Sequence, residues 1–135
     1  MHQRIHDSFA RQGLMQSFGA QLQTVAPGRV EIVAPIRPEA SQQHGAAHAG
    51  LTFALADSAV GYAALTLMPE GREVMTVEAK INLIAPALGE SLIARGEVAK
   101  AGRRLTVCRA EVFARRDGRE TCVALLQATM IAVDP

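Results

Sequence analysis

The feature that most constrains the fold is a segment of about 20 residues, from Ala49 to about Met68, whose helical pattern is apolar on nearly every side. Its large apolar residues are Leu51, Leu55, Val60 and Tyr62. Most of the others are Ala or Gly, and Pro69-Glu70-Gly71 forms a stop signal. Because so little bulk surrounds this helix, other elements can approach it closely on several sides. The segment therefore predicts a helix around which a curved sheet wraps.

The residues after this helix have the pattern of long strands. Residues 75–83 alternate between apolar and polar side chains, the period of two of a half-buried strand. The apolar set is Met75, Val77, Ala79, Ile81 and Leu83, and the polar set is Thr76, Glu78, Lys80 and Asn82. The alternation places Thr76 on the polar side. Further strand patterns occupy 91–101, 104–116 and 120–133, with turn signals at Gly102 and Asp117-Gly118.

Before the central helix, residues 4–16 predict a short amphipathic helix, and residues 18–36 predict two strands around a Pro27-Gly28 turn. The order is then helix, two strands, long helix, and three or four strands. We expect a single α+β domain over residues 1–135, with 1–16 as an N-terminal helix or extension. Its antiparallel sheet would have five or six strands wrapped around one helix.

Charge and composition exclude several classes of function. The 14 basic and 13 acidic residues leave a net charge of +1, which indicates neither a nucleic-acid nor a membrane partner. The first residues lack a signal-peptide pattern, so we expect a cytoplasmic protein. Cys108 and Cys122 are too few for a disulfide framework and lack the other ligands of a zinc site. Free thiols, and no metal or separate cofactor, are expected.

The start of the central helix, "AAHAG", raises a chemical question. Helices usually open on Ser, Thr, Asp or Asn, whose side chain accepts a hydrogen bond from a free backbone N–H. None of these stands here. Uncapped N–H groups at the positive end of a helix dipole suit an oxygen that gains negative charge. We therefore expect the N–H groups of residues 48–50 to be free for a substrate oxygen.

The stretch "QQHGAAHAGLTFALAD", residues 42–57, resembles the signature of the hot-dog-fold acyl-CoA thioesterases, most closely the subgroup of phenylacetate degradation. That signature has Asn, then Gly three residues later, His-Gly-Gly after three more, and Asp nine after the His. The corresponding residues here are Gln42, Gly45, His48-Ala49-Gly50 and Asp57. "TVEAKINLIAPALGES", residues 76–91, also resembles the following strand of that family. The departures are Gln42 in place of Asn and Ala49 in place of Gly.

The resemblance covers about residues 14–133 and implies a hot-dog fold and hydrolysis of an acyl-CoA thioester. It implies that Asp57 is the base or nucleophile, that the backbone N–H of Ala49 is the oxyanion donor, and that Thr76 can hold the attacking water. Coenzyme A would be part of the substrate. The other residues implied in the site are His48 and Gln42 as catalytic or positioning groups, and Gly45 and Gly50 as substrate-binding groups. Because coenzyme A carries phosphates, we also expect cationic contacts from Arg103 and Arg104, which lie at strand ends.

Two alternatives stay open. A hot-dog hydratase would carry His five residues after the Asp, but that position is Tyr62, so hydratase chemistry is disfavoured. A non-catalytic acyl-CoA-binding protein of the same fold would be expected to lose the carboxylate, whereas Asp57 is present.

The spacing of the two central groups also predicts an assembly. Ala49 and Asp57 are eight residues apart, about 12 Å along a helix. A reacting carbon must lie about 3 Å from both groups, or one water further. Two antiparallel helices side by side can meet this requirement, each chain supplying one group. We therefore expect a homodimer, with dimers pairing further into a tetramer through the exposed sheet face.

Overall fold

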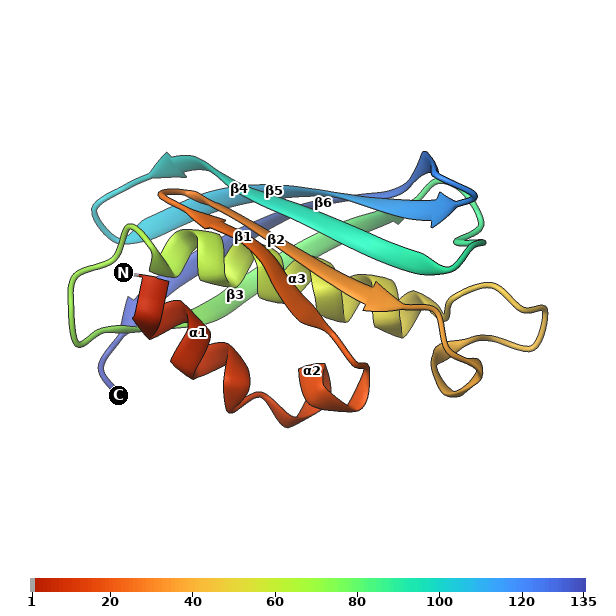
Figure 1. The fold of residues 1–135 in the computed structure, drawn as a ribbon. Coiled ribbons are helices and arrows are strands. Elements are labelled where there is room, and N and C mark those ends of the chain that lie inside the picture. Colours follow the sequence, from red (N-terminus) through yellow and green to blue (C-terminus); the bar gives the residue numbers. More distant parts are fainter. Residues whose placement is uncertain (1) are drawn as a thin grey trace.

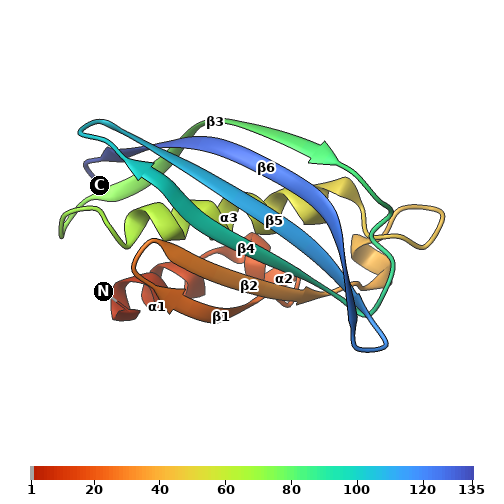
Figure 2. The ribbon, with the colours of Figure 1, turned by 90° about the horizontal axis from the view of Figure 1, so that it is seen from above.

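In the computed structural model, which describes residues 2–135, one long helix lies against a curved antiparallel sheet of six strands (Figures 1 and 2). The elements are α1 (His2–Ala10), α2 (Gly13–Ser17), β1 (Gln21–Ala26), β2 (Arg29–Pro35), the 3-10 turn η1 (Pro38–Ala40), α3 (Ala49–Leu65), β3 (Glu73–Leu83), β4 (Ser91–Ala101), β5 (Leu105–Arg116) and β6 (Arg119–Val133). The strand order is β1-β2-β4-β5-β6-β3. The predicted fold class, an α+β sheet wrapped around a central helix, is confirmed.

Two predicted helix boundaries are wrong. The N-terminal helix expected over residues 4–16 is two helices, α1 and α2, separated at Arg11 and Gln12. The central helix was expected to reach Met68 but ends at Leu65. Its last turn tightens, because the N–H groups of Leu67 and Met68 bond to carbonyls three residues back. The Thr66 hydroxyl likewise donates to the Ala63 carbonyl at 2.6 Å.

The close fit between α3 and the sheet depends on small residues. The helix packs against β2, β3, β4, β5 and β6, and Ala59, near its middle, is fully buried. Gly96 of β4 crosses it there, and a Cβ built on Gly96 would lie 2.7 Å from the Ala59 carbonyl carbon. The sheet can therefore approach the helix backbone only where both elements lack bulk.

Gly96→Ala should lower the free energy of unfolding by about 2 kcal/mol, because its methyl group would collide with the backbone of α3 and force sheet and helix apart. Urea denaturation measures this change. Gly13→Ala is the matched control: a Cβ there meets no atom within 4 Å, and it should leave stability unchanged or slightly raised. Equal stability of the two variants would contradict the close approach.

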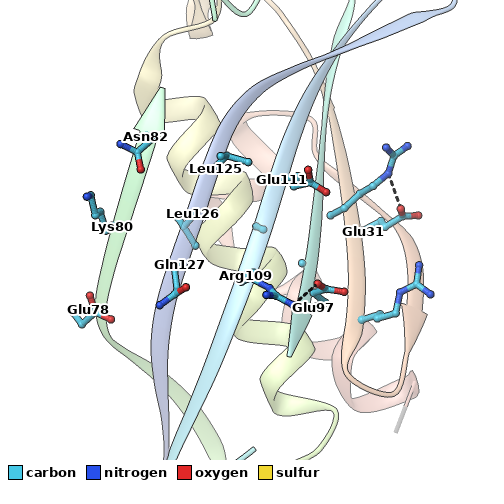
Figure 3. Close-up of a pocket in the computed structure, with 14 residues that line it drawn as sticks. Glu31, Glu78, Lys80, Asn82, Glu97, Arg109, Glu111, Leu125, Leu126 and Gln127 are labelled. Atoms are coloured by element: carbon cyan, nitrogen blue, oxygen red, sulfur yellow. Dashed lines mark hydrogen bonds and ion pairs between the residues drawn. The ribbon is translucent and has the colours of Figure 1, made fainter. Parts of the chain in front are cut away.

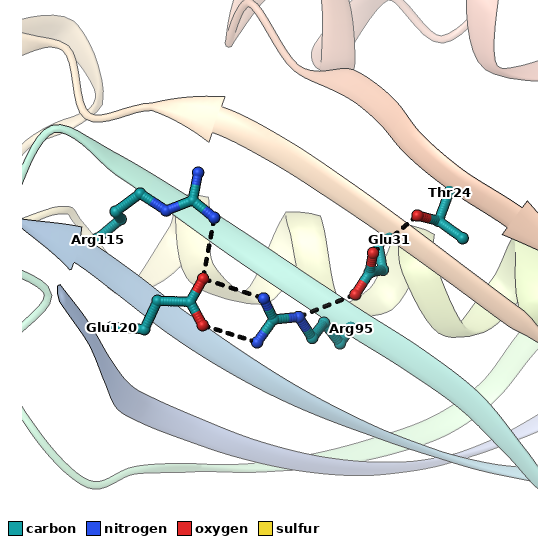
Figure 4. Close-up of polar contacts among 5 residues, drawn as sticks. All are labelled: Thr24, Glu31, Arg95, Arg115 and Glu120. Atoms are coloured by element: carbon teal, nitrogen blue, oxygen red, sulfur yellow. Dashed lines mark hydrogen bonds and ion pairs between the residues drawn. The ribbon is translucent and has the colours of Figure 1, made fainter. Parts of the chain in front are cut away.

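The sheet face turned away from α3 carries charged side chains of both signs. Arg95 donates to Glu31 at 2.9 Å and to both oxygens of Glu120, and Arg115 also donates to Glu120 at 2.9 Å (Figure 4). The hydrogen bond from Arg95 is the largest influence on Glu120 and lowers the pKa of its carboxyl group. These side chains are 22–41% exposed, so each pair adds little stability and the network mainly orders the face.

Candidate active site

The start of α3 is capped by a histidine. His48 has extended backbone angles, φ −62° and ψ 143°, and its Nδ1 accepts a hydrogen bond from the Gly50 N–H at 2.7 Å. The expectation that the N–H groups of residues 48–50 are all free is therefore wrong for Gly50. It is also wrong for His48, whose own N–H bonds to the Ala40 carbonyl. Within residues 2–135, the Ala49 N–H has no hydrogen-bond acceptor.

Alanine fits this position without strain. Asp117 is the one non-glycine residue of the described chain with a positive φ, so Ala49 does not adopt the left-handed conformation that would require glycine. The His48, Ala49 and Gly50 residues are all exposed, which leaves the Ala49 N–H open to a molecule approaching from outside the chain.

The loop before the helix is held by its own hydrogen bonds. The Gln42 side-chain oxygen accepts from the His44 N–H, so this amide folds back on the loop. The Gln42 N–H bonds to the Ala46 carbonyl at 2.8 Å. Gly45 has φ +89°, which glycine adopts readily. In this chain Gln42 and Gly45 thus shape the loop that leads to the helix start.

Asp57 lies two turns into α3 and is half-buried. Thr76 of β3 donates its hydroxyl to Asp57 Oδ1 at 2.8 Å, and the Thr76 Oγ1 atom also lies 3.4 Å from the Met130 sulfur. The resemblance brought Thr76 into the site, but its predicted orientation on the polar side of the strand is wrong. A β-bulge between Thr76 and Glu78 reverses the alternation, so Thr76 faces the helix while Glu78 faces outward beside Thr129.

A cavity of about 250 Å³ adjoins Asp57 and Thr76. Seven of its ten lining residues carry polar side chains, which is unusual next to an apolar helix. The lining residues are Ser8, Gln12, Asp57, Ser58, Gly61, Tyr62, Glu73, Val74, Thr76 and Met130. Ser8 and Gln12 come from the N-terminal segment, which no sequence motif predicts to lie here.

The N-terminal helix is fixed over this cavity by an arginine. Arg4 of α1 donates to the carbonyls of Leu65, Met68 and Pro69, at the end of α3 where carbonyl groups lack helical partners. This contact holds α1 along α3, as Figure 1 shows, and brings the following residues to the cavity wall.

The remaining predicted residues lie elsewhere. Arg103 and Arg104 are exposed in the turn between β4 and β5, near the end of the sheet where α3 finishes, and one chain does not bring them to the helix start (Figure 1). Ala49 and Asp57 are eight residues apart on the same helix, so one chain does not bring these two groups together either.

A larger hollow of about 850 Å³ lies on the opposite face of the sheet (Figure 3). Side chains of both charges line it, among them Glu78 and Lys80 of β3 and Arg109 of β5. It is remote from Asp57 because the sheet lies between them. Its size therefore does not make it the reaction site, and the cavity beside Asp57 is the better candidate.

In the described residues 2–135, every helix is too short or too polar to cross a membrane, and no cluster of His, Cys, Asp and Glu has the arrangement of a metal site.

The comparisons with known proteins agree with this geometry. Residues 44–121 match the model of the thioesterase superfamily. A thioesterase family protein from Silicibacter pomeroyi is 47% identical, with a TM-score of 0.97 over 99% of this chain and 98% of that one. Two further structures share the fold at lower identity. They are the thioesterase HI1161 from Haemophilus influenzae (18%, TM-score 0.84, 96% and 88% covered) and the PaaI protein of the E. coli phenylacetic acid degradation operon (20%, TM-score 0.87, 97% and 91% covered).

No curated protein sequence matches the chain. The family model spans more than half of the chain, and the Silicibacter pomeroyi protein is similar over nearly all of it. The chain therefore belongs to the thioesterase superfamily and is a thioester hydrolase with a hot-dog fold.

Proposed function

We propose that this protein hydrolyses acyl-CoA thioesters to a free acid and coenzyme A, with Asp57 as the base or nucleophile. The observation that carries the proposal is the hydrogen bond from Thr76 to Asp57 beside a polar cavity. It fixes the carboxylate at a place where water and a small acyl group can both reach it. Membership of the thioesterase superfamily supports the same chemistry.

In the base form of this mechanism, Asp57 takes a proton from water while the water oxygen attacks the thioester carbon. The carbonyl oxygen gains negative charge, and the Ala49 N–H at the positive end of α3 stabilises it. The C–S bond then breaks, and coenzyme A leaves as a thiol after taking a proton. In the nucleophile form, Asp57 attacks the carbon directly, the C–S bond breaks as coenzyme A leaves and takes a proton, and water then hydrolyses the resulting anhydride to the free acid and the Asp57 carboxylate. Thr76 orients the carboxylate in either form.

We propose that two chains share each site. The α3 positions that this chain leaves exposed or half-exposed include Ala49, Phe53 and Asp57, which are four residues apart and share one face of the helix. A second α3 lying antiparallel on this face would bring its Ala49 towards Asp57. Each chain would then supply the oxyanion donor to one site and the carboxylate to the other.

The edge strand β3 supports a homodimer. It pairs with β6 on one side and with no strand of the described chain on the other. Met75 and Val77, in its first half, are 58% and 55% exposed. An unpaired edge with large exposed apolar side chains favours pairing with another chain. The outer hollow, with charges of both signs, would be the surface through which such dimers form a tetramer.

The other predicted residues receive supporting roles in this proposal. His48 caps α3 through Nδ1, which accepts from the Gly50 N–H, so Nε2 is the ring nitrogen that can face a substrate. Gln42 and Gly45 position the loop. Gly50 leaves room for the His48 ring, because a Cβ built on Gly50 would lie only 3.0 Å from His48 Nδ1. Arg103 and Arg104 of one chain would contact the phosphates of a coenzyme A molecule whose remaining contacts are made mainly by the partner chain.

The direct test is an assay of purified protein with acetyl-, butyryl-, hexanoyl- and phenylacetyl-CoA, detecting the released thiol. The protein's own thiols should interfere little at pH 8, because burial raises the pKa of Cys108 to about 11 and also raises that of Cys122. Hydrolysis of at least one substrate well above the rate without protein is expected. Tight binding of all substrates without hydrolysis would instead identify a non-catalytic acyl-CoA-binding protein.

A further inference from the structure

Gly61 has no packing reason to be glycine. It lies in the interior of α3, where glycine is less favourable than alanine, and its backbone is buried. Nevertheless, a Cβ built on Gly61 would meet no atom within 4 Å. In contrast, Gly96 is required because the α3 backbone lies against it. The space beside Gly61 is therefore part of the cavity, and glycine keeps it open.

This space adjoins the reacting group. Gly61 follows Asp57 by four residues, so the two share a helix face and are slightly more than one turn apart, about 6 Å along the axis. The cavity volume of about 250 Å³ holds about eight non-hydrogen atoms at ~30 Å³ each, the volume of a water molecule in the liquid. An acyl group whose carbonyl lies at Asp57 would thus extend past Gly61.

Beyond Gly61 the cavity wall is polar. Gln12 donates through Nε2 to the Tyr62 hydroxyl at 2.9 Å, and that hydroxyl also pairs with Ser8 Oγ at 3.1 Å. Gln12 Nε2 lies 3.5 Å from Ser58 Oγ. Within residues 2–135, Gln12 Oε1 makes no hydrogen bond, although Gln12 is half-buried. With Nε2 held by Tyr62, this oxygen is an oriented acceptor at the wall of the cavity.

Building on the proposed function, we infer that this cavity is the acyl pocket and selects short acyl groups that carry a hydroxyl on the third carbon. Gly61 would provide the room and Gln12 the acceptor for that hydroxyl. Three bonds of extended chain span about 3.5 Å, and a hydrogen bond adds about 2.9 Å. Together they span about 6 Å, which matches the distance from Asp57 to Gly61 along the axis of α3, and Gln12 lies at that level because it bonds to the neighbouring Tyr62. The carboxylate of Glu73, in the same cavity, opposes acyl groups that end in a second carboxylate.

The first test compares 3-hydroxybutyryl-CoA with butyryl-CoA, which differ by one hydroxyl. The native protein should show a kcat/KM about tenfold higher for the hydroxylated substrate, the scale of one hydrogen bond in a partly buried site. Gln12→Leu should reduce this ratio to about one, and Tyr62→Phe, which removes the group that orients the amide, should reduce it partly. Gln3→Leu, on the exposed side of α1, is the matched control and should leave the ratio unchanged.

The second test uses a substitution that favours folding. Gly61→Ala should raise Tm by about 2 °C, because alanine is preferred in a helix and the methyl group enters open space. It should lower kcat/KM for 3-hydroxybutyryl-CoA about tenfold relative to acetyl-CoA, which does not extend past residue 61. A stabilised variant with an unchanged ratio of these two substrates would overturn the pocket assignment.

The outcomes separate this inference from the proposed function. Hydrolysis of butyryl-CoA at least as fast as of 3-hydroxybutyryl-CoA, or a ratio unaffected by Gln12→Leu in a folded variant, overturns the pocket and leaves the thioesterase proposal standing. Absence of turnover with every acyl-CoA overturns both.

Discussion

Replacing Asp57 with Asn should lower kcat by a factor of about 100 or more, with the fold intact. The expected loss follows from removing the group that takes the proton from water or attacks the thioester. Folding should persist because an Asn side-chain oxygen can still accept the Thr76 hydroxyl that bonds to Asp57 Oδ1. Steady-state kinetics on the best acyl-CoA substrate, with circular dichroism of both proteins, measures the two effects.

The matched control is Asp7→Asn, at an exposed carboxylate of α1 that is bonded to Gln3 and lies outside the cavity. It should retain full kcat. If Asp57→Asn also kept nearly full kcat, Asp57 could be neither the base nor the nucleophile.

Mixing two inactive variants should restore turnover if each site is shared between chains. Ala49→Pro removes the proposed oxyanion donor, because proline has no N–H. The variant should fold, since Ala49 is the first residue of α3, where proline is well tolerated. His48 already has the extended conformation that a residue before proline requires. Ala49→Pro alone should therefore be folded but nearly inactive.

In a dimer of one Asp57→Asn chain and one Ala49→Pro chain, both defects fall in one site and the other site is intact. Up to half of the sites in such mixed dimers should then work. The measurement needs proof of subunit exchange, for example by native mass spectrometry of a tagged and an untagged chain. Failure to recover activity in proven mixed dimers, or full activity in a monomer, would refute the shared site.

The incorrectly predicted orientation of Thr76 shows a limit of sequence patterns. The alternation over residues 75–83 predicted β3 itself, and the resemblance named Thr76, which the structure brings into contact with Asp57. A bulge adds one residue without changing composition, and Val77, the extra residue, looks like any other strand residue. The face of the sheet to which alternate side chains point can therefore switch within the strand, and only the pairing with β6 reveals this switch.

The helix start and the cavity illustrate a different limit. His48 caps α3, whereas the usual N-cap residues are Ser, Thr, Asp and Asn. The sequence around the helix start contains none of these four, so it does not predict the cap. The cavity wall joins Gln12 to Tyr62, which are 50 residues apart in the sequence. The sequence pattern identifies Tyr62 as a large residue of the central helix and as the residue at the position of a hydratase histidine, but not as part of a cavity wall. Contacts between such distant residues depend on tertiary packing, which no local pattern encodes.

The position of β3 in the sheet has a consequence for the order in which the strands can pair while the chain is being synthesised. The ribosome completes β3 before β4, β5 and β6, yet among the strands of residues 2–135 its one neighbour is β6, where Thr76 lies opposite Met130. Until Arg119–Val133 has emerged, no other strand of the described residues is available to pair with β3. The strand that carries Thr76 is therefore the last to be fixed, and Asp57 gains its hydrogen bond only when the sheet is complete. A nascent chain that ends short of β6 would be an inactive thioesterase with both edges of β3 open to other chains.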